Sequence, residues 1–415
     1  MPSGQDDILS RLPPLRNAAA FDRPVSMPEY YHACIGTSPR TLEGPRDVIF
    51  ALEGELDGGI TPAQWQQALD RVAEANPGLR MRWHGSLGWS RWRCDGPPPR
   101  LRLIDDCAWD ARSNIGAGFI TETPLSLTEG PVVELIVARQ SATRGLVILR
   151  TVHAVMDGSG GYHTLRELFR ALRGEPLQGS NATFSDVDLL KAIAAPAVKP
   201  EPVQTCWLTG APDGDATGDD WWRIPLGPAR SQLLGRVAVA MAAFAHTHST
   251  LPVRIAVPVD LRRHAPGLLA TTNFSSMLFV TLQPGDGIDV FREQLRAQLA
   301  VKREAAYSSL LDLFRWLPLS WLDRMLGRTL ANYRNRRVPE TALISSLGVL
   351  DPAEFSARGF TLDGMSVVPM AGTVFTVLMV IGGQAQLMLN LPRVLSGQGR
   401  REALIAHLQA SLATA

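Results

Sequence analysis

The sequence predicts an α/β protein of two lobes, in each of which helices pack on a β-sheet. The chain has 415 residues, of which 45% are hydrophobic and 20% charged, so we expect two lobes of roughly 200 residues each rather than one core. Segments with strand and helix patterns alternate along both halves. A shift to Pro, Gly and Asp between residues 174 and 220 places the boundary near residue 185. The predicted lobes are therefore 1–185 and 186–415.

The first half contains a well-defined helix signal. In "TPAQWQQALDRVAEANP", Thr61 and Gln64 have the spacing of a capping box, and Pro62 suits the first helical position. The pattern predicts a helix that begins after Thr61 and ends at Asn76-Pro77. Apolar runs predict strands at 48–53, 80–84, 132–138 and 146–153.

The second half has the same style. We expect helices at about 228–247, 288–306 and 399–412, strands at 253–259 and 276–282, and a hairpin around Gly382 and Gly383. The segment 308–330 is apolar at helical spacing and is broken by Pro318. A core or interlobe helix pair is the favoured interpretation. A membrane-surface element is the alternative, which the mixed charges of the polar face disfavour.

Composition excludes several classes of partner and site. Lys and Arg number 41 against 40 Asp and Glu, and the net charge of +1 gives no broad footprint for nucleic acid. The four cysteines lack the C-x-x-C spacing of a zinc or redox site, and reduced thiols fit a cytoplasmic protein. The longest apolar run, near 374–381, is far shorter than the ~18 residues of a membrane span. We therefore expect a cytoplasmic protein without a membrane span, whose partners are small molecules or one protein.

A titratable corner lies in "VILRTVHAVMDGSGGYHTLRELF", residues 147–169. The apolar run predicts a central strand that ends at His153, where side chains at the edge of a sheet commonly face a cleft. Asp157 could orient the imidazole, or it could pair with an arginine and fix the turn. We expect Gly158 to allow the torsions of a sharp turn. A histidine that is merely hydrogen-bonded to backbone remains an equal alternative on spacing alone.

Other motifs fit less well. Met156 stands where the nucleophile elbow G-x-S-x-G needs glycine, and no lysine follows the glycines as in a P-loop. His246 and His248 form an H-x-H pair, but no nearby Cys or carboxylate completes a metal site. No metal is expected.

The segment "HAVMDG", with the small-residue turn and "LREL" helix that follow it, resembles the H-x-x-x-D-G signature of the condensation-domain and chloramphenicol-acetyltransferase-like acyltransferase superfamily. Segments of both halves are also similar to that superfamily: "ALDRVAEANPGLRMRW" at 68–83, "TPLSLTEGPVVELIVAR" at 123–139, "VPVDLRRHAPG", "TTNFSSMLFVTL" and "ISSLGVLD". The resemblance therefore covers most of the chain.

The resemblance implies two chloramphenicol-acetyltransferase-like lobes, each a mixed sheet with packed helices, which form a V with a central tunnel. It implies that His153 is the catalytic histidine. Asp157 and Gly158 match the structural pair of the motif, and Arg262 matches an arginine that binds Asp157. Acyl donors of such enzymes are thioesters of coenzyme A or of a carrier protein's phosphopantetheine.

Two departures affect the subgroup. Many relatives have two adjacent histidines, and the first is Val152 here; the Asn of a late "SNlG" segment is Ser346. We therefore expect a free-standing acyltransferase of secondary metabolism. His153, with a reference pKa of about 6.5, is suited to remove the proton of a hydroxyl or amine acceptor as it attacks the thioester. Candidates for residues that line the tunnel and stabilise the oxyanion are Asn273, Ser345 and Ser346.

The donor is expected to reach the protein without a tightly bound cofactor. The chain has three lysines, and its densest basic group is "RNRR" at 334–337. This composition favours an acyl or peptidyl carrier protein acting in trans over acyl-CoA, with Arg336 and Arg337 as contacts for an acidic carrier. A solvated surface run is the alternative for these arginines. The alternative for the whole protein is a non-catalytic docking module or a cyclase-like variant.

Overall fold

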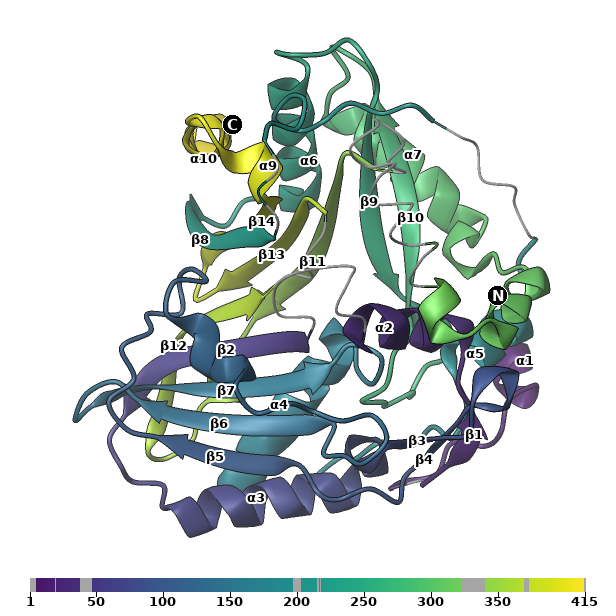
Figure 1. Ribbon diagram of the computed structural model, residues 1–415, viewed down its shortest axis with the longest axis vertical. Coiled ribbons are helices and arrows are strands. Elements are labelled where there is room, and N and C mark those ends of the chain that lie inside the picture. Colours follow the sequence, from purple (N-terminus) through teal and green to yellow (C-terminus); the bar gives the residue numbers. More distant parts are fainter. Residues whose placement is uncertain are drawn as a thin grey trace.

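The computed structural model describes residues 5–18, 20–37, 47–196, 203–214, 216, 218–322, 325, 340–368 and 373–413. Its strands form two large sheets, one in each lobe, which run at a steep angle to one another (Figure 1). The first sheet has the order β12-β2-β7-β6-β5, with strands Phe360–Val368, Asp47–Leu56, Arg144–Val152, Val133–Arg139 and Arg100–Ile104. The second has the order β10-β9-β11-β13-β14-β8, with strands Ser275–Leu282, Val253–Asp260, Ala342–Leu350, Phe375–Ile381, Gln384–Pro392 and Asp219–Pro228. The predicted two-lobe α/β architecture is confirmed.

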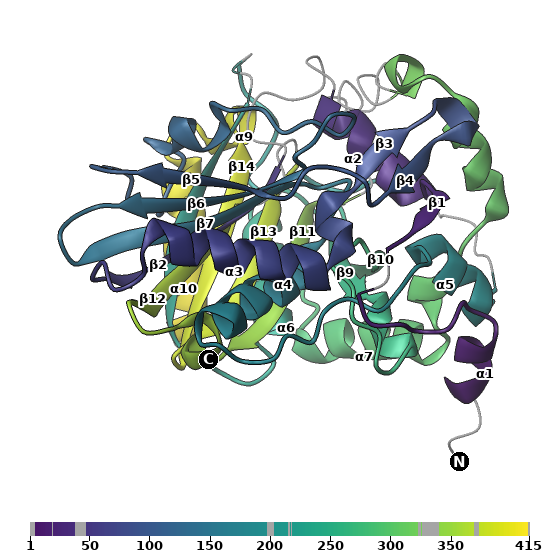
Figure 2. The ribbon, with the colours of Figure 1, turned by 90° about the horizontal axis from the view of Figure 1, so that it is seen from below.

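The helices pack on the sheets in the same way in both lobes. In the first lobe α3 (Pro62–Ala75) and α4 (Gly158–Leu172) lie side by side over one face of the sheet (Figures 1 and 2). In the second lobe three helices pack on the sheet, namely α6 (Leu233–Ala245), α7 (Ile288–Ala300) and α10 (Arg400–Ala413). The other α-helices are α1 (Gln5–Ser10), α2 (Met27–Thr37), α5 (Asp186–Ile193) and α9 (Arg393–Ser396).

Shorter elements complete the described part of the chain. A small sheet has the order β1-β4-β3, with strands Asp22–Pro24, Arg91–Arg93 and Arg82–His84. The 3-10 helices are η1 (Pro77–Arg80), η2 (Leu87–Trp89), η3 (Ala117–Thr121), η4 (Leu261–His264), η5 (Arg303–Ala305), η6 (Ser309–Trp316) and η7 (Pro352–Phe355).

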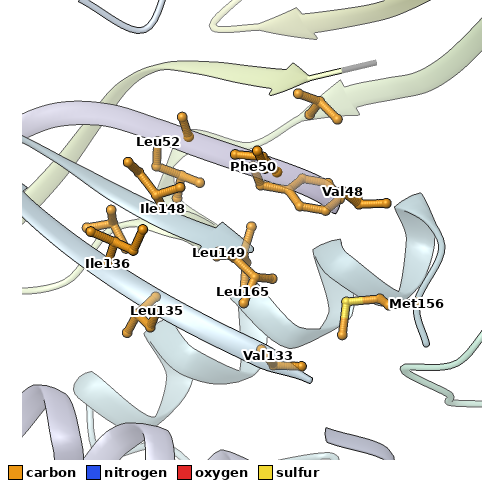
Figure 3. Close-up of a cluster of buried hydrophobic side chains, with 14 of the residues drawn as sticks. Val48, Phe50, Leu52, Val133, Leu135, Ile136, Ile148, Leu149, Met156 and Leu165 are labelled. Carbon is orange, nitrogen blue, oxygen red and sulfur yellow. The ribbon is translucent and has the colours of Figure 1, made fainter. Parts of the chain in front are cut away.

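Local sequence signals explain the first lobe well. The Thr61 side chain accepts from the Gln64 backbone and the Gln64 side chain accepts from the Thr61 backbone, which is the predicted capping box. Strand β7 is buried along nearly its whole length, as its continuous apolar run predicts. Its side chains Ile148 and Leu149 pack with those of β2, β6 and α4 in the core (Figure 3). This packing fixes the end of β7, where the functional corner begins.

The lobes do not divide at a single point in the sequence. Strand β12, which the prediction assigned to the second lobe, pairs antiparallel with β2 in the first sheet. The second half of the chain therefore completes the sheet of the first lobe. A boundary near residue 185 describes the order along the chain, whereas the hydrogen-bonded sheets share strands across it. Helix α5 also lies just after this point and packs in a small core of its own with Phe184 and Phe274.

Two expectations about the second half are wrong. Residues up to Pro228 belong to β8, and the helix expected from 228 begins only at Leu233. The apolar segment after residue 308 forms the 3-10 helix η6, and its side chains do not enter a core, since Leu310 is 71% and Leu313 62% exposed. Within the described ranges, no helix has the length and apolar character needed to cross a bilayer.

Candidate active site

His153 lies one residue beyond β7, in the turn that leads to α4, and its ring is half-buried. Its Nδ1 lies 3.1 Å from the carbonyl oxygen of Met156. A carbonyl only accepts hydrogen bonds, so Nδ1 carries the proton and Nε2 keeps its lone pair. Among the described residues Nε2 has no hydrogen-bond partner. The arrangement leaves one basic nitrogen open for chemistry.

Burial lowers the pKa of His153 from its ordinary value of 6.5, and the negative charge of Asp157 partly opposes this effect. The imidazole is therefore neutral at neutral pH. A neutral imidazole whose second nitrogen is fixed by backbone can accept a proton without changing its tautomer first.

Asp157 fixes the start of α4 and not the imidazole. Its Oδ1 accepts from the backbone N–H of Gly160 at 2.8 Å, so it is the N-cap of the helix. Its two oxygens also accept from Arg262 at 3.0 and 3.1 Å, and Oδ2 accepts from the Phe274 backbone at 2.7 Å. No hydrogen bond joins Asp157 to the ring of His153. Of the two alternatives, pairing with an arginine is the one the geometry has.

Arg262 belongs to η4 of the second lobe and reaches across to Asp157 in the first. Its guanidinium is largely buried, with 12% of the side chain exposed. It also donates to Asp260 at 3.0 Å and to the backbone carbonyls of Ala270 and Thr272 at 3.2 and 2.6 Å. The ion pair is thus a buried, hydrogen-bonded connection between the lobes at the corner that carries His153.

Residues 271–274 of the second lobe lie against this corner. The Asn273 side chain donates from Nδ2 to the backbone carbonyl of His153 at 2.8 Å. Asn273 is only 3% exposed, and its Oδ1 is buried without a partner. The predicted tunnel residue Asn273 therefore holds the backbone of His153 from behind.

The two serine candidates separate onto different sides of β11. Successive residues of a strand point to opposite faces. Ser346 lines a cavity of about 390 Å³ that is formed mainly by apolar side chains of α6, α7 and β13. The next residue, Leu347, lies on the other side, because its Cδ2 is 3.1 Å from the place that a Cβ on residue 158 would take. By this alternation Ser345 shares the face of Leu347, which is the face toward the corner, and Ser346 does not.

The glycines of the motif have a different role from the expected one. Gly158 does not have a positive φ, so the turn does not need its torsional freedom. The closest approaches are at Gly160 and Gly161, where a Cβ would collide with the backbone carbonyl of Thr271 and with the ring of Phe50. These two glycines let α4 approach the second lobe and the first sheet. The sequence predicts a turn but not which partners come close, because these contacts join distant segments.

His32, on α2, is a site residue that the sequence analysis missed. Its ring stacks on that of His153, with centroids 4.0 Å apart and planes at 20°. The segment "MPEYYHACIGT" has no motif. The one available signal is a titratable side chain among small and aromatic residues, which does not predict a contact with His153.

The remaining predicted contacts lie elsewhere. Arg336 and Arg337 fall outside the described residues. Among the residues that are described, no three His, Cys, Asp or Glu side chains gather in a group able to hold a metal ion.

Comparison with known proteins places this geometry in a known fold. No protein-family profile matches the chain. The uncharacterized protein Rv2305 of Mycobacterium tuberculosis is 26% identical over 319 residues, which are 65% of this chain and 72% of that protein. The condensation domain of the monacolin K polyketide synthase MokA superposes with a TM-score of 0.65 and 13% identity, over 95% of this chain and 98% of that one.

Two further solved structures agree. The first condensation domain of the calcium-dependent antibiotic synthetase has a TM-score of 0.65 and 20% identity, over 96% of this chain and 97% of that one. The starter condensation domain of rhizomide synthetase RzmA has a TM-score of 0.63 and 15% identity, over 96% of both chains. The chain therefore has the two-lobed fold of the condensation domains over nearly its whole length.

Proposed function

We propose that the protein is a condensation-type acyltransferase that moves an acyl group from a thioester to a hydroxyl or amine of a small acceptor. The observation that carries the proposal is the fixed, neutral imidazole of His153, whose Nε2 is free, at the junction of two condensation-domain lobes. Asp157, Gly158 and Arg262 support the corner, and His153 is the residue that acts on the substrate. Secondary metabolism is the proposed context.

His153 would act as a general base. Its Nε2 takes the proton of the acceptor as the acceptor's oxygen or nitrogen attacks the thioester carbonyl carbon. The tetrahedral intermediate then collapses, the carbon–sulfur bond breaks, and the departing sulfur receives the proton from His153. A thiol has a pKa of about 8.5, far below that of an alcohol, so sulfur is the better leaving group. The products are an ester or amide and a free thiol, and His153 returns to its neutral form.

The donor class rests on chemistry and on the structural neighbours. The rhizomide starter condensation domain was solved in complex with C8-CoA, and in another structure with C8-CoA and Leu-SNAC. These complexes support a thioester donor for the present chain. We propose that this donor is a substrate, either acyl-CoA or the phosphopantetheine thioester of a carrier protein, and that no cofactor stays bound.

The choice between coenzyme A and a carrier protein remains a prediction. Composition favours a carrier in trans, with Arg336 and Arg337 as its contacts. Equal concentrations of an acyl-CoA and the matching acyl-carrier would be compared. Faster transfer from the carrier, with slower carrier-dependent transfer in R336E/R337E, supports the carrier. Equal rates, with no effect of the two substitutions, overturn it. A cytoplasmic location and a central tunnel also remain predictions.

The rival function is a docking module or cyclase-like member that transfers no acyl group. The presence of His153 with an open nitrogen favours the enzyme. The purified protein would be mixed with a panel of acyl thioesters and pooled acceptors, and thiol release and intact masses would be measured. An acceptor that gains the acyl mass supports acyl transfer. Absence of transfer across the panel, together with stable binding of a carrier protein, supports the docking module instead.

A further inference from the structure

We infer that His32 is a second functional residue of this site, which donates a hydrogen bond from Nε2 to the carbonyl oxygen of the acyl thioester. The inference rests on the proposed function, because that function supplies the carbonyl. It concerns the electrophilic half of the reaction, for which no donor follows from the motif around His153. The two histidines would then divide the work, His153 accepting a proton and His32 donating a hydrogen bond.

The position of the His32 ring comes first. It is stacked on the ring of His153 with centroids 4.0 Å apart, so a group bound at the edge of one ring is also near the edge of the other. In a tetrahedral intermediate, the attacking atom and the oxyanion are bound to the same carbon. A base and a hydrogen-bond donor must therefore be close neighbours, and stacked imidazoles satisfy this requirement.

The two nitrogens of His32 have different surroundings. Nδ1 is buried and has no hydrogen-bond partner. Nε2 is not buried in this way and has no partner among the described residues. A buried N–H without an acceptor is costly, so the tautomer with the proton on Nε2 is favoured. That tautomer presents an N–H donor on the accessible side of the ring.

The charge state of His32 agrees with this role. Burial, together with the neighbouring His153, lowers the pKa of His32 well below its ordinary value. A neutral His32 donates a hydrogen bond without repelling the positive charge that develops on His153 during proton transfer. His32 keeps its own proton throughout. The π electrons of the carbonyl move onto oxygen during attack and return when the carbon–sulfur bond breaks.

Helix α2 holds His32 in place from both of its neighbouring turns. Glu29, one turn before His32, forms a buried ion pair with Arg23 at 2.7 and 2.9 Å and accepts from the Ser26 backbone at 2.8 Å. The Tyr30 hydroxyl donates to the Leu317 carbonyl at 2.7 Å. A donor that is fixed before the substrate arrives is the arrangement that stabilises developing charge most effectively.

The test compares substitutions that separate the ring from its N–H. His32→Phe keeps an aromatic ring for the stack and removes both nitrogens, whereas His32→Gln can place an amide N–H near the position of Nε2. We expect His32→Phe to lower kcat by roughly 10²–10³-fold with little change in KM, and His32→Gln to recover part of the loss. Tyr31→Phe, on the neighbouring residue of the same helix, should retain the wild-type rate.

The pH profile and NMR separate this role from its rivals. His32→Phe should keep the acid limb of kcat/KM, because that limb belongs to His153. Nitrogen-15 NMR of the histidine rings, assigned with His32→Phe and His153→Ala, should show the proton of His32 on Nε2. Wild-type kcat in His32→Phe, loss of the acid limb, or a proton on Nδ1 would each overturn the inference. If wild type transfers no acyl group, the proposed function fails, and the NMR result still decides the tautomer.

Discussion

Two polar clusters meet at the start of α4, and they differ in what they leave open. In the Asp157 cluster both carboxylate oxygens accept hydrogen bonds, from the helix, from Arg262 and from the second lobe. In the His153 cluster each of the two stacked rings keeps Nε2 without a protein partner among the described residues. The comparison teaches that a satisfied cluster holds the site together, whereas an unsatisfied one is available to substrate.

The largest expected effect is at the open cluster. His153→Ala should lower kcat/KM by roughly 10²–10⁴-fold, because it removes the general base. The melting temperature should stay close to that of wild type, since the ring makes one hydrogen bond to the protein, to the Met156 carbonyl. Wild-type turnover at saturating substrate would remove His153 from the base role and would erase the distinction between the clusters.

The satisfied cluster should respond in the opposite way. Asp157→Ala and Arg262→Ala each leave a buried charge without its partner and should cost about 3–5 kcal/mol of unfolding free energy. The double variant should be less destabilised than the sum of the two. Denaturant unfolding of the four proteins measures this coupling. If both single variants melt like wild type and only catalysis falls, Asp157 acts on His153 and not on the fold.

The glycines sharpen the comparison with a smaller effect. Gly160→Ala should destabilise by about 1–3 kcal/mol, because the added methyl group meets the rigid backbone carbonyl of Thr271. Gly158→Ala should cost less than this, since its neighbour at 3.1 Å is the end of the flexible Leu347 side chain. The order of the two unfolding free energies tests the contact. A reversed order would show that the torsions of residue 158, and not the space around residue 160, constrain the corner.

The smallest expected effect is a shift of a pH profile. Because burial lowers the pKa of His153, the neutral base persists to a pH below 6.5, and kcat/KM should be flat at neutral pH and fall only below that value. A hydroxyl acceptor should give this single limb. An amine acceptor should add a rise toward high pH as it loses its own proton. A limb above pH 6.5 with a hydroxyl acceptor would contradict the lowered pKa.

Local patterns predicted those parts of the molecule whose partners are close in sequence. The capping box of Thr61 and Gln64, the buried strand β7 and the cap of α4 each depend on a few neighbouring residues. The contact of Arg262 with Asp157 came from the resemblance alone, because nothing in the spacing of the two residues indicates it. The strength of the prediction therefore followed the range of the contact.

The missed features depend on contacts between distant segments. β12 joins the first sheet through hydrogen bonds to β2, and His32 stacks on His153 from a helix without a motif. The apolar spacing of η6 also predicts burial, but the chain turns those side chains outward, as the exposure of Leu310 shows. Periodicity tells which residues share a face, whereas tertiary packing decides where that face points.

The central claim is that the open imidazole of His153 activates an acceptor against a thioester. The most direct measurement follows thiol release and the acceptor mass together, with one acyl thioester, with and without acceptor, in wild type and His153→Ala. We predict that wild type releases thiol only when acceptor is present, that the acceptor gains the acyl mass, and that both signals are nearly lost in the variant. Thiol release without acceptor, or equal transfer by the two proteins, would contradict the claim.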